Sequence, residues 1–190
     1  YFYSNSIFEN DLKNLLATIT IISIYKDIQK LDRNIFYDHK KTKGRGDVVK
    51  VKLFEKFFYL MDESYNSNPL SLKSALKNFD MIKIDNSKKH IVLGDMLELG
   101  KHSKKLHIEI GTSINNTSLK NINVIGKHVK WTFNCLNKSK KGIIIKKKYQ
   151  IIDLIKNDLN NNDYLMIKGS NSTGLNSLAN QIKTGKINAL

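Results

Sequence analysis

The spacing of apolar residues divides the chain into two parts joined by a polar stretch. Residues 11–30 predict one helix with two apolar stripes, the first Leu12, Leu15, Leu16 and Ile19 and the second Ile21, Ile24, Tyr25 and Ile28. Stripes on two faces predict a helix that is buried on more than one side. The ten preceding residues cannot supply such a core, and the chain starts at Tyr1 rather than Met. We therefore expect the helix to be the end of a domain whose body is missing.

The second part alternates between strand and helix patterns. Residues 38–46 (DHKKTKGRG) are polar with two glycines and suit a boundary. Strands are expected at 48–53 and 57–61, a hairpin turning near Glu55 and Lys56, and then at 90–93, 123–125, 142–145 and 164–167. Helices are expected at 70–79, 103–114, 127–136, 151–159 and 175–182, the first with Asn68 as N-cap and Pro69 in its first turn. The fold class is therefore α/β, a mostly parallel sheet with helices on both faces.

Polar and charged side chains follow four of the predicted strands. In open α/β sheets, ligands bind outside the carboxyl ends of the strands. The loops are residues 62–69 (DESYNSNP), 94–100 (GDMLELG), Gly126 and 168–174 (KGSNSTG). They bring carboxylates (Asp62, Glu63, Asp95, Glu98), amides (Asn66, Asn68, Asn171), one lysine (Lys168) and hydroxyls (Ser64, Tyr65, Ser170) to one edge. This mixture suits a small zwitterionic or polar ligand better than a nucleic acid strand.

Each of these signals alone also has a structural explanation. Residues 62–66 can be strand-end chemistry followed by a helix cap, and residues 94–100 can be a turn. Residues 168–174 contain the Gly, Ser and Lys of a phosphate cradle but do not match GxxxxGK[ST], and they precede a helix start that would tolerate an anion. His102 and His107 lack the i, i+4 spacing of a zinc pair, and Cys135 has no partner base. We expect no metal site.

The net charge of +15, from 32 Lys and Arg against 17 Asp and Glu, points at first to nucleic acid. However, Arg33 and Arg45 are the only arginines, and nucleic-acid-binding proteins rely on Arg for bidentate contacts. A bias towards Lys, Asn and Ile is typical of AT-rich coding DNA. We therefore interpret the basic runs at 39–43, 138–141 and 146–148 as solvated faces, and expect no nucleic acid partner.

Composition also predicts the setting of the protein. With 41% apolar residues the chain can bury a core, and its single cysteine, Cys135, cannot form an internal disulfide. No window approaches the roughly 18 apolar residues of a membrane span, and no secretory signal is visible. We expect a cytoplasmic monomer without membrane insertion.

Five motifs, taken in order and spacing, resemble the C-terminal part of the Mur ligases of bacterial peptidoglycan synthesis. They are GRG at 44–46, DESYNSNP at 62–69, LGDMLELG at 93–100, HSKKLH at 102–107 and KGS at 168–170. The match is to the branch that adds D-Ala-D-Ala to UDP-N-acetylmuramoyl-tripeptide. The resemblance implies that residues 1–40 are the tail of the central ATPase domain, 41–46 a linker, and 47–190 the Rossmann-like C-terminal domain.

The resemblance also implies site residues. Nucleotide contacts carry over to Asn14, in a run NLLAT, and to Arg45, while Asp11 stands where the family has a further asparagine. Either Asp62 or Glu63 matches the acid that holds the ribose, and the register between them stays open. Residues implied on the dipeptide side of the cleft are Tyr65, Asn66, Asn68, Asp95, Lys168 and Ser170.

The implied reaction is ATP-dependent amide ligation through an acyl phosphate, with ATP and Mg²⁺ held mainly by the missing central domain. The Gly-rich GKT or GKS loop that would cradle the ATP phosphates is absent from these 190 residues. We therefore expect no catalytic residue within the chain, and no activity of the chain alone. The alternatives are a stand-alone, non-catalytic binding module with the same fold and, from the charge, a nucleic-acid-binding domain.

Overall fold

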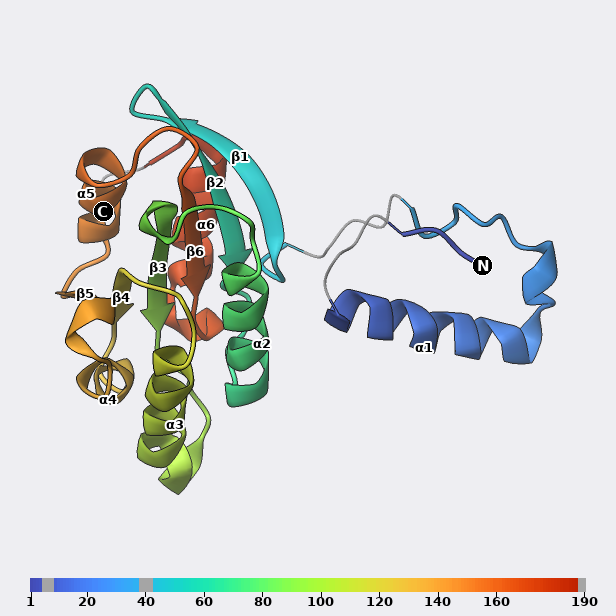
Figure 1. Ribbon diagram of the computed structural model, residues 1–190, viewed down its shortest axis with the longest axis horizontal. Helices are drawn as coiled ribbons and strands as arrows, with labels where there is room; N and C mark the ends of the chain where they lie inside the picture. Colours follow the sequence, from blue (N-terminus) through green and yellow to red (C-terminus); the bar gives the residue numbers. More distant parts are fainter. Residues whose placement is uncertain (5–8, 38–42, 188–190) are drawn as a thin grey trace. The chain divides into compact units, whose positions relative to one another are not determined.

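Six strands form one sheet, and all but one of its neighbouring pairs are parallel (Figure 1). The computed structural model describes residues 1–4, 9–37 and 43–187. The strands are β1 (Asp47–Leu53), β2 (Lys56–Glu63), β3 (Lys89–Gly94), β4 (Ile122–Ile125), β5 (Lys141–Ile145) and β6 (Tyr164–Lys168), in the spatial order β1-β2-β6-β3-β4-β5. Only β1 and β2 pair antiparallel among the described strands. The predicted mostly parallel sheet is confirmed.

Helices cover both faces of this sheet. They are α2 (Pro69–Asp80), α3 (Ser103–Asn115), α4 (Val129–Asn134), α5 (Tyr149–Asn157) and α6 (Leu175–Thr184), with short 3₁₀ turns at Asn86–Lys88, Gly100–His102, Lys138–Lys140 and Asn171–Thr173. One apolar core packs α2, α3 and α4 against the sheet, with Phe79 and Ile110 at 0% exposure. A second core packs α5 and α6 through Ile155 and Ile182. Two cores on opposite faces confirm the predicted α/β layers.

Helix α2 begins as the sequence predicts. Asn68 Oδ1 accepts a hydrogen bond from the backbone N–H of Ser71 at 2.8 Å, and Ser71 Oγ accepts one from the backbone N–H of Asn68 at 3.1 Å. Pro69 follows as the first helical residue, where its missing N–H costs nothing. This reciprocal cap fixes the direction in which the chain leaves the loop after β2.

The chain divides into two units, residues Tyr1–Lys41 and Thr42–Leu190. In the first, α1 (Glu9–Tyr25) ends five residues before the predicted end at residue 30, and a separate 3₁₀ turn, Ile28–Lys30, follows. The break occurs because Asp27 caps the new turn through Gln29. Some predicted features lie outside the described residues. They are the boundary at 40–41, the first two residues of the predicted linker, most of the basic run 39–43, and residues 188–190.

The two apolar stripes of α1 are not covered. Leu16 is 63% exposed and Ile24 72% exposed, and no described side chain of this helix is buried. The expected burial on more than one side is therefore not found within the described residues. Among those same residues, no helix has both the length and the apolar character needed to cross a membrane.

Helices α4 and α5 also differ from the predictions. The helix expected at 127–136 is shorter at both ends, and at its start the N–H groups of residues 127–129 bind the Asp95 carboxylate. Helix α5 begins two residues before its expected start, where the side-chain amide of Gln150 accepts hydrogen bonds from the N–H groups of Lys146 and Lys147.

The β1–β2 hairpin turns one residue earlier than predicted. Leu53 pairs with Lys56, so Phe54 and Glu55 form the two-residue turn, with φ of 51° and 58°. Two consecutive positive φ values are typical of the type I′ turn that best fits the twist of a hairpin. Neither residue type favours this conformation, so the turn is strained.

Replacing Glu55 with Gly should therefore stabilise the protein. An L-residue in the left-handed region costs about 1–2 kcal/mol, partly offset by the greater freedom of Gly in the unfolded chain, so we expect a net gain of about 0.5–1 kcal/mol. Urea unfolding followed by circular dichroism measures it. Glu55→Ala is the matched control, because it removes the same exposed ion pair with Lys52 but still places a residue with a Cβ atom at a positive φ. Equal stabilities of the two variants would show that the turn is not strained.

Candidate functional site

Five parallel strands end at the same edge of the sheet, which we call the carboxyl edge. The loops that start there follow β2, β6, β3, β4 and β5, in this spatial order. They include the four loops that the sequence predicted to lie together. The edge carries three charged residues that are almost completely buried, Asp62, Lys168 and Asp95. Each is held differently.

Asp62 is enclosed by a network that links β1, β2 and α6. Its carboxylate accepts hydrogen bonds from the backbone N–H and the hydroxyl of Ser64. The ammonium of Lys183 lies 2.6 Å from Asp62 Oδ2 and 2.6 Å from Asp47 Oδ2. Burial of Lys183 acts to lower its pKa, but the two carboxylates outweigh that effect and raise the pKa. Asp62, at 0% exposure, is therefore an anchor within the fold.

Lys168 and Glu63 form the neighbouring pair. They are partners in the register of β2 and β6, and Lys168 Nζ lies 3.5 Å from Glu63 Oε2 and donates to the backbone carbonyl of Asn66 at 3.0 Å. Burial lowers the pKa of Lys168, and Glu63 partly offsets this. The positive charge of Arg45 acts in the same direction as burial, which places Arg45 in the electrostatic environment of this pair.

The segment carrying Arg45 is fixed on the loop after β2. Tyr65 N–H donates to the carbonyl of Gly44 at 3.1 Å, and the Arg45 guanidinium lies 4.7 Å from the centroid of the Tyr65 ring. Gly44 has a φ of 76°, and a Cβ there would come within 2.9 Å of Tyr65 Cβ. Only glycine permits this close approach, so the predicted GRG segment holds an exposed arginine beside Glu63 and Lys168.

A polar pocket of about 230 Å³ lies between the loops after β2, β6 and β3. Its lining includes Tyr65, Asn66, Glu98 and Ser170. Ser170 joins the three loops: its hydroxyl accepts from the backbone N–H of Leu97 and donates to the carbonyl of Ser67. The structure thus brings three of the predicted dipeptide-side residues, Tyr65, Asn66 and Ser170, to one cavity.

Asp95 has both carboxylate oxygens occupied by backbone groups. They accept hydrogen bonds of 2.7–3.0 Å from the N–H groups of Lys127, His128 and Val129, at the start of α4. A negative charge is favourable at a helix N-terminus. Asp95 is 8% exposed, so its carboxylate holds the loop after β4 in place.

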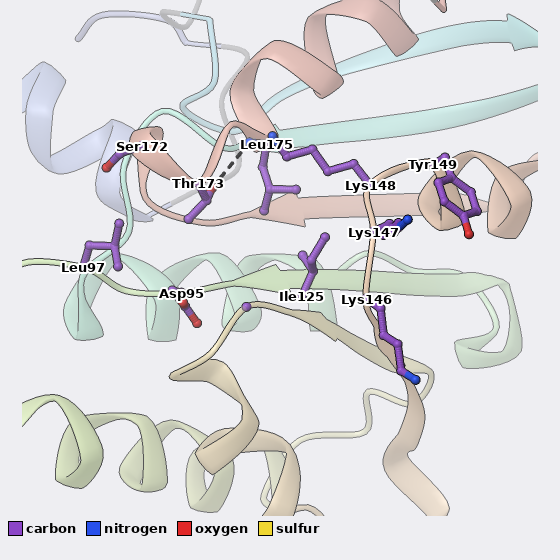
Figure 2. A pocket seen from close by; sticks show the side chains of 11 residues that line it. Asp95, Leu97, Ile125, Lys146, Lys147, Lys148, Tyr149, Ser172, Thr173 and Leu175 are labelled. Carbon is purple, nitrogen blue, oxygen red and sulfur yellow. Dashed lines mark hydrogen bonds between the residues drawn. The ribbon is translucent and has the colours of Figure 1, made fainter. Parts of the chain in front are cut away.

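A larger pocket of about 700 Å³ lies farther along the edge, between the loops after β3, β4, β5 and β6 (Figure 2). Apolar side chains of Leu97, Ile125 and Leu175 line it, together with the hydroxyl residues Ser172 and Thr173. The run of Lys146, Lys147 and Lys148 forms another side. Lys146 and Lys147 are exposed, as predicted for a solvated face, whereas Lys148 is half-buried. The three lysines directly follow the predicted strand 142–145, and this position in the sequence indicates that they lie at the carboxyl edge.

His107 supports the loop after β3 from below. The ring donates from Nδ1 to the carbonyl of Ser103 at 2.8 Å, and Nε2 accepts from the backbone N–H of Met96 at 3.2 Å. Both contacts require the neutral ring with its proton on Nδ1. Burial lowers the pKa of His107 below its ordinary value of 6.5. The histidine of the HSKKLH motif is thus a structural support.

Two further predicted residues, Asn68 and Asn14, lie at the start of helix α2 and in the first unit, respectively. Asn68 caps α2, as described above, and Asn14 lies on α1 in the first unit, where it is exposed. The described residues contain no group of three or more His, Cys, Asp or Glu that could hold a metal ion. Sequence reasoning missed the Lys183–Asp47 pair, because Lys183 lies 136 residues from Asp47 and only the packing of α6 brings them together.

Comparison with known proteins finds one protein family in this region. The family described as "Mur ligase, glutamate ligase domain" matches residues 44–171. A UDP-N-acetylmuramoyl-tripeptide–D-alanyl-D-alanine ligase of Rickettsia prowazekii is 27% identical over 171 residues, covering 90% of this chain. The ligase of the same name from Buchnera aphidicola (strain Bp) is 29% identical over 178 residues, covering 91%. The chain spans 36% of the length of each of these relatives.

Solved structures show the same fold. The ligase MurF of Thermotoga maritima, crystallised with ADP, superposes with a TM-score of 0.72 at 20% identity, covering 97% of this chain and 39% of that one. MurF of Acinetobacter baumannii superposes with a TM-score of 0.75 at 19% identity, covering 96% and 39%. The arrangement of strands and helices described above is therefore one that full ligase structures contain.

The support given by His107 should make the stability of the protein depend on pH. The unfolded chain binds a proton at His107 near pH 6.5, whereas the folded chain binds it only at lower pH, so stability falls as pH drops from 7 to 5. Replacing His107 with Gln should reduce this dependence, measured by thermal unfolding across that range. His102→Gln, at an exposed position outside the buried network, should leave it unchanged. An undiminished slope in the His107 variant would contradict the assignment.

Proposed function

The chain belongs to the Mur ligase family, through its glutamate ligase domain, and on this premise we propose that it is the C-terminal part of an ATP-dependent amide ligase. The reaction proposed for the whole protein joins D-Ala-D-Ala to UDP-N-acetylmuramoyl-tripeptide, as the names of the relatives state for those proteins. ATP phosphorylates the tripeptide carboxylate to an acyl phosphate, the dipeptide amine attacks its carbonyl carbon, and phosphate leaves. We propose that the protein works in the cytoplasm, as a monomer.

The observation that carries this proposal is the coincidence of the family match with the carboxyl edge. Residues 44–171 include the Arg45 segment, the loops after β2 and β3, and the start of the loop after β6. These elements build a cationic group, a carboxylate and a polar pocket beside one another. A ligase domain that receives a nucleotide and a zwitterionic dipeptide needs all three.

We assign the nucleotide side of the site to Arg45 and Glu63. Arg45 is exposed beside the Tyr65 ring, where its guanidinium can neutralise phosphate charge during transfer. Between the two candidate acids, Glu63 is the one with solvent access, because the Asp62 carboxylate is enclosed by Ser64 and Lys183. Glu63 is therefore the residue we propose to accept hydrogen bonds from the ribose hydroxyls. Asn14 is proposed as an adenine contact on the family resemblance alone.

The dipeptide side is assigned to the pocket of about 230 Å³. Tyr65, Asn66 and Ser170 line it, and Lys168 holds the loop from below through the carbonyl of Asn66. Such a cavity restricts the approach of the amine, and correct orientation of two reactants supplies a large part of catalysis. Asp95 and Asn68 contribute by positioning loops, since their side chains are occupied within the fold.

The family chemistry also calls for Mg²⁺ to neutralise phosphate charge. The described residues offer no cluster of carboxylates or histidines that fits this ion. We propose that a part of the ligase outside these 190 residues holds the ion and the phosphate-binding loop.

The proposal is tested by the coding DNA and by a ligation assay. The reading frame on the 5′ side of Tyr1 should contain a GKT or GKS loop, and the full-length product should form the pentapeptide precursor and ADP from the three substrates. The 190-residue chain alone should show no ATP-dependent ligation, because no GKT or GKS loop occurs in it. A start codon directly before Tyr1 would instead support a non-catalytic binding module.

The assignment of Glu63 predicts different effects for the two neighbouring acids. In the full-length ligase, Glu63→Gln should raise the KM for ATP about 10-fold, through loss of a charged hydrogen bond, and should also lower the unfolding temperature, because Glu63 is the charged partner of the buried Lys168. Asp62→Asn should destabilise the protein by about 3 kcal/mol, because it leaves Lys183 without one of its buried partners, but should leave the KM for ATP unchanged. The reverse pattern, a kinetic defect confined to the Asp62 variant, would move the ribose contact to Asp62.

A further inference from the structure

The two pockets of the carboxyl edge adjoin each other but differ in charge. Leu97 and Ser172 line both of them, so the cavities meet between the loops after β3 and β6. The smaller pocket contains the carboxylate of Glu98. The larger contains three lysines, and its one acid, Asp95, has its oxygens occupied by three backbone N–H groups. The smaller pocket is thus lined by an acid, whereas the larger pocket is lined by three lysines.

Lys148 is the lysine that reaches into the larger pocket. Figure 2 shows its side chain crossing toward Leu175 at the start of α6, while Lys146 and Lys147 extend from the opposite side of their loop. A Cβ added to Gly174 would collide with the Lys148 ammonium. The absence of a side chain at Gly174 therefore provides the space that this ammonium group occupies. In the part of the chain that the structure describes, none of the three lysines forms an ion pair with a carboxylate.

The surroundings of Lys148 suit a small organic anion rather than an inorganic one alone. Leu97, Ile125 and Leu175 form apolar walls, and Ser172 and Thr173 complete the lining on that side, the Thr173 hydroxyl donating to the carbonyl of Ser170. An acid with short alkyl substituents can place its methyl groups on these walls while its carboxylate faces the ammonium. A lysine in a partly apolar pocket forms a stronger charged hydrogen bond than one in open solvent.

We propose that the pocket of about 700 Å³ is the subsite for the carboxylate end of the incoming dipeptide, with the Lys148 ammonium as its charge partner. This inference rests on the proposed function and adds an orientation to it. The dipeptide lies along the carboxyl edge, its terminal carboxylate in the lysine pocket and its amine in the pocket that contains Glu98. Its C-terminal methyl group packs on Leu97, Ile125 and Leu175.

This orientation is the one that the reaction needs. The smaller pocket adjoins the proposed nucleotide contacts, because its lining includes Tyr65, whose ring carries the Arg45 guanidinium, whereas the described lining of the larger pocket includes no residue of the loop after β2. The dipeptide amine then faces the proposed nucleotide contacts, where the acyl phosphate forms, and the carboxylate faces away from them.

The test compares D-Ala-D-Ala with its C-terminal amide, which lacks the negative charge, as substrates of the full-length ligase. Wild-type enzyme should have a KM roughly 10- to 100-fold lower for the acid than for the amide, the range expected for one charged hydrogen bond. Lys148→Met should remove this preference by raising the KM for the acid, with the KM for the amide and for ATP unchanged. Lys148→Arg, which keeps the charge, should retain the preference.

Lys156→Met is the matched control, because it removes one exposed lysine from the other end of α5. It should leave all KM values within 2-fold of wild type, and thermal unfolding verifies that each variant is folded. An acid preference that persists in Lys148→Met would overturn the proposal, and so would an effect of that variant on the KM for ATP alone. Failure of the wild-type enzyme to ligate the dipeptide at all would count against the proposed function instead.

Discussion

A buried charge must have a partner within the protein, and this requirement organises the carboxyl edge. Parallel strands end side by side, so the charged residues at their ends are enclosed by neighbouring loops. Asp62 is compensated by Lys183, Lys168 by Glu63 and the Asn66 carbonyl, and Asp95 by the first N–H groups of α4. Removal of a partner leaves part of the desolvation of the buried charge uncompensated. Each pair therefore holds one loop in a defined position.

These anchors explain why several polar residues at the edge do not face a ligand. Asp95 and Asn68 resemble binding residues in the sequence, but each carries hydrogen bonds to backbone N–H groups at a helix start. Tyr65, Asn66 and Glu98 stand on the same loops with exposed or half-exposed side chains. The division follows from physical chemistry, because a carboxylate that already accepts three hydrogen bonds has little remaining capacity for a substrate. The anchors make the exposed groups rigid, and rigid groups orient a reactant at low entropic cost.

The fold class, the layer order and the meeting of the four loops could be predicted, since they follow from apolar periodicity and from the rule that parallel strands share an edge. The helix cap at Asn68 could also be predicted, because it depends only on residues that are neighbours in the sequence. Three features could not be predicted from the sequence. The end of α1 at Tyr25 depends on a cap by Asp27, the hairpin turn at Phe54 and Glu55 has none of the usual turn residues, and the Lys183 network joins residues far apart in sequence. The distinction between Asp62 and Glu63 was also beyond the sequence, because it depends on which side chain α6 covers.

The lysine excess has a different meaning once the positions of the lysines are known. Lys89 and Lys140 are buried beside helix ends, where their ammonium groups donate to the carbonyls of Asp80 and of Thr117 and Leu119, and burial lowers the pKa of both. Lys89 thus satisfies the last carbonyl of α2, and Lys140 satisfies two carbonyls of the segment that follows α3. Others, such as Lys156, are simply solvated. Lys148 belongs to neither group, because it enters a cavity with apolar walls and no carboxylate pairs with it among the described residues. Net charge therefore says little about the function of this chain, whereas the location of a single ammonium group within the fold is informative.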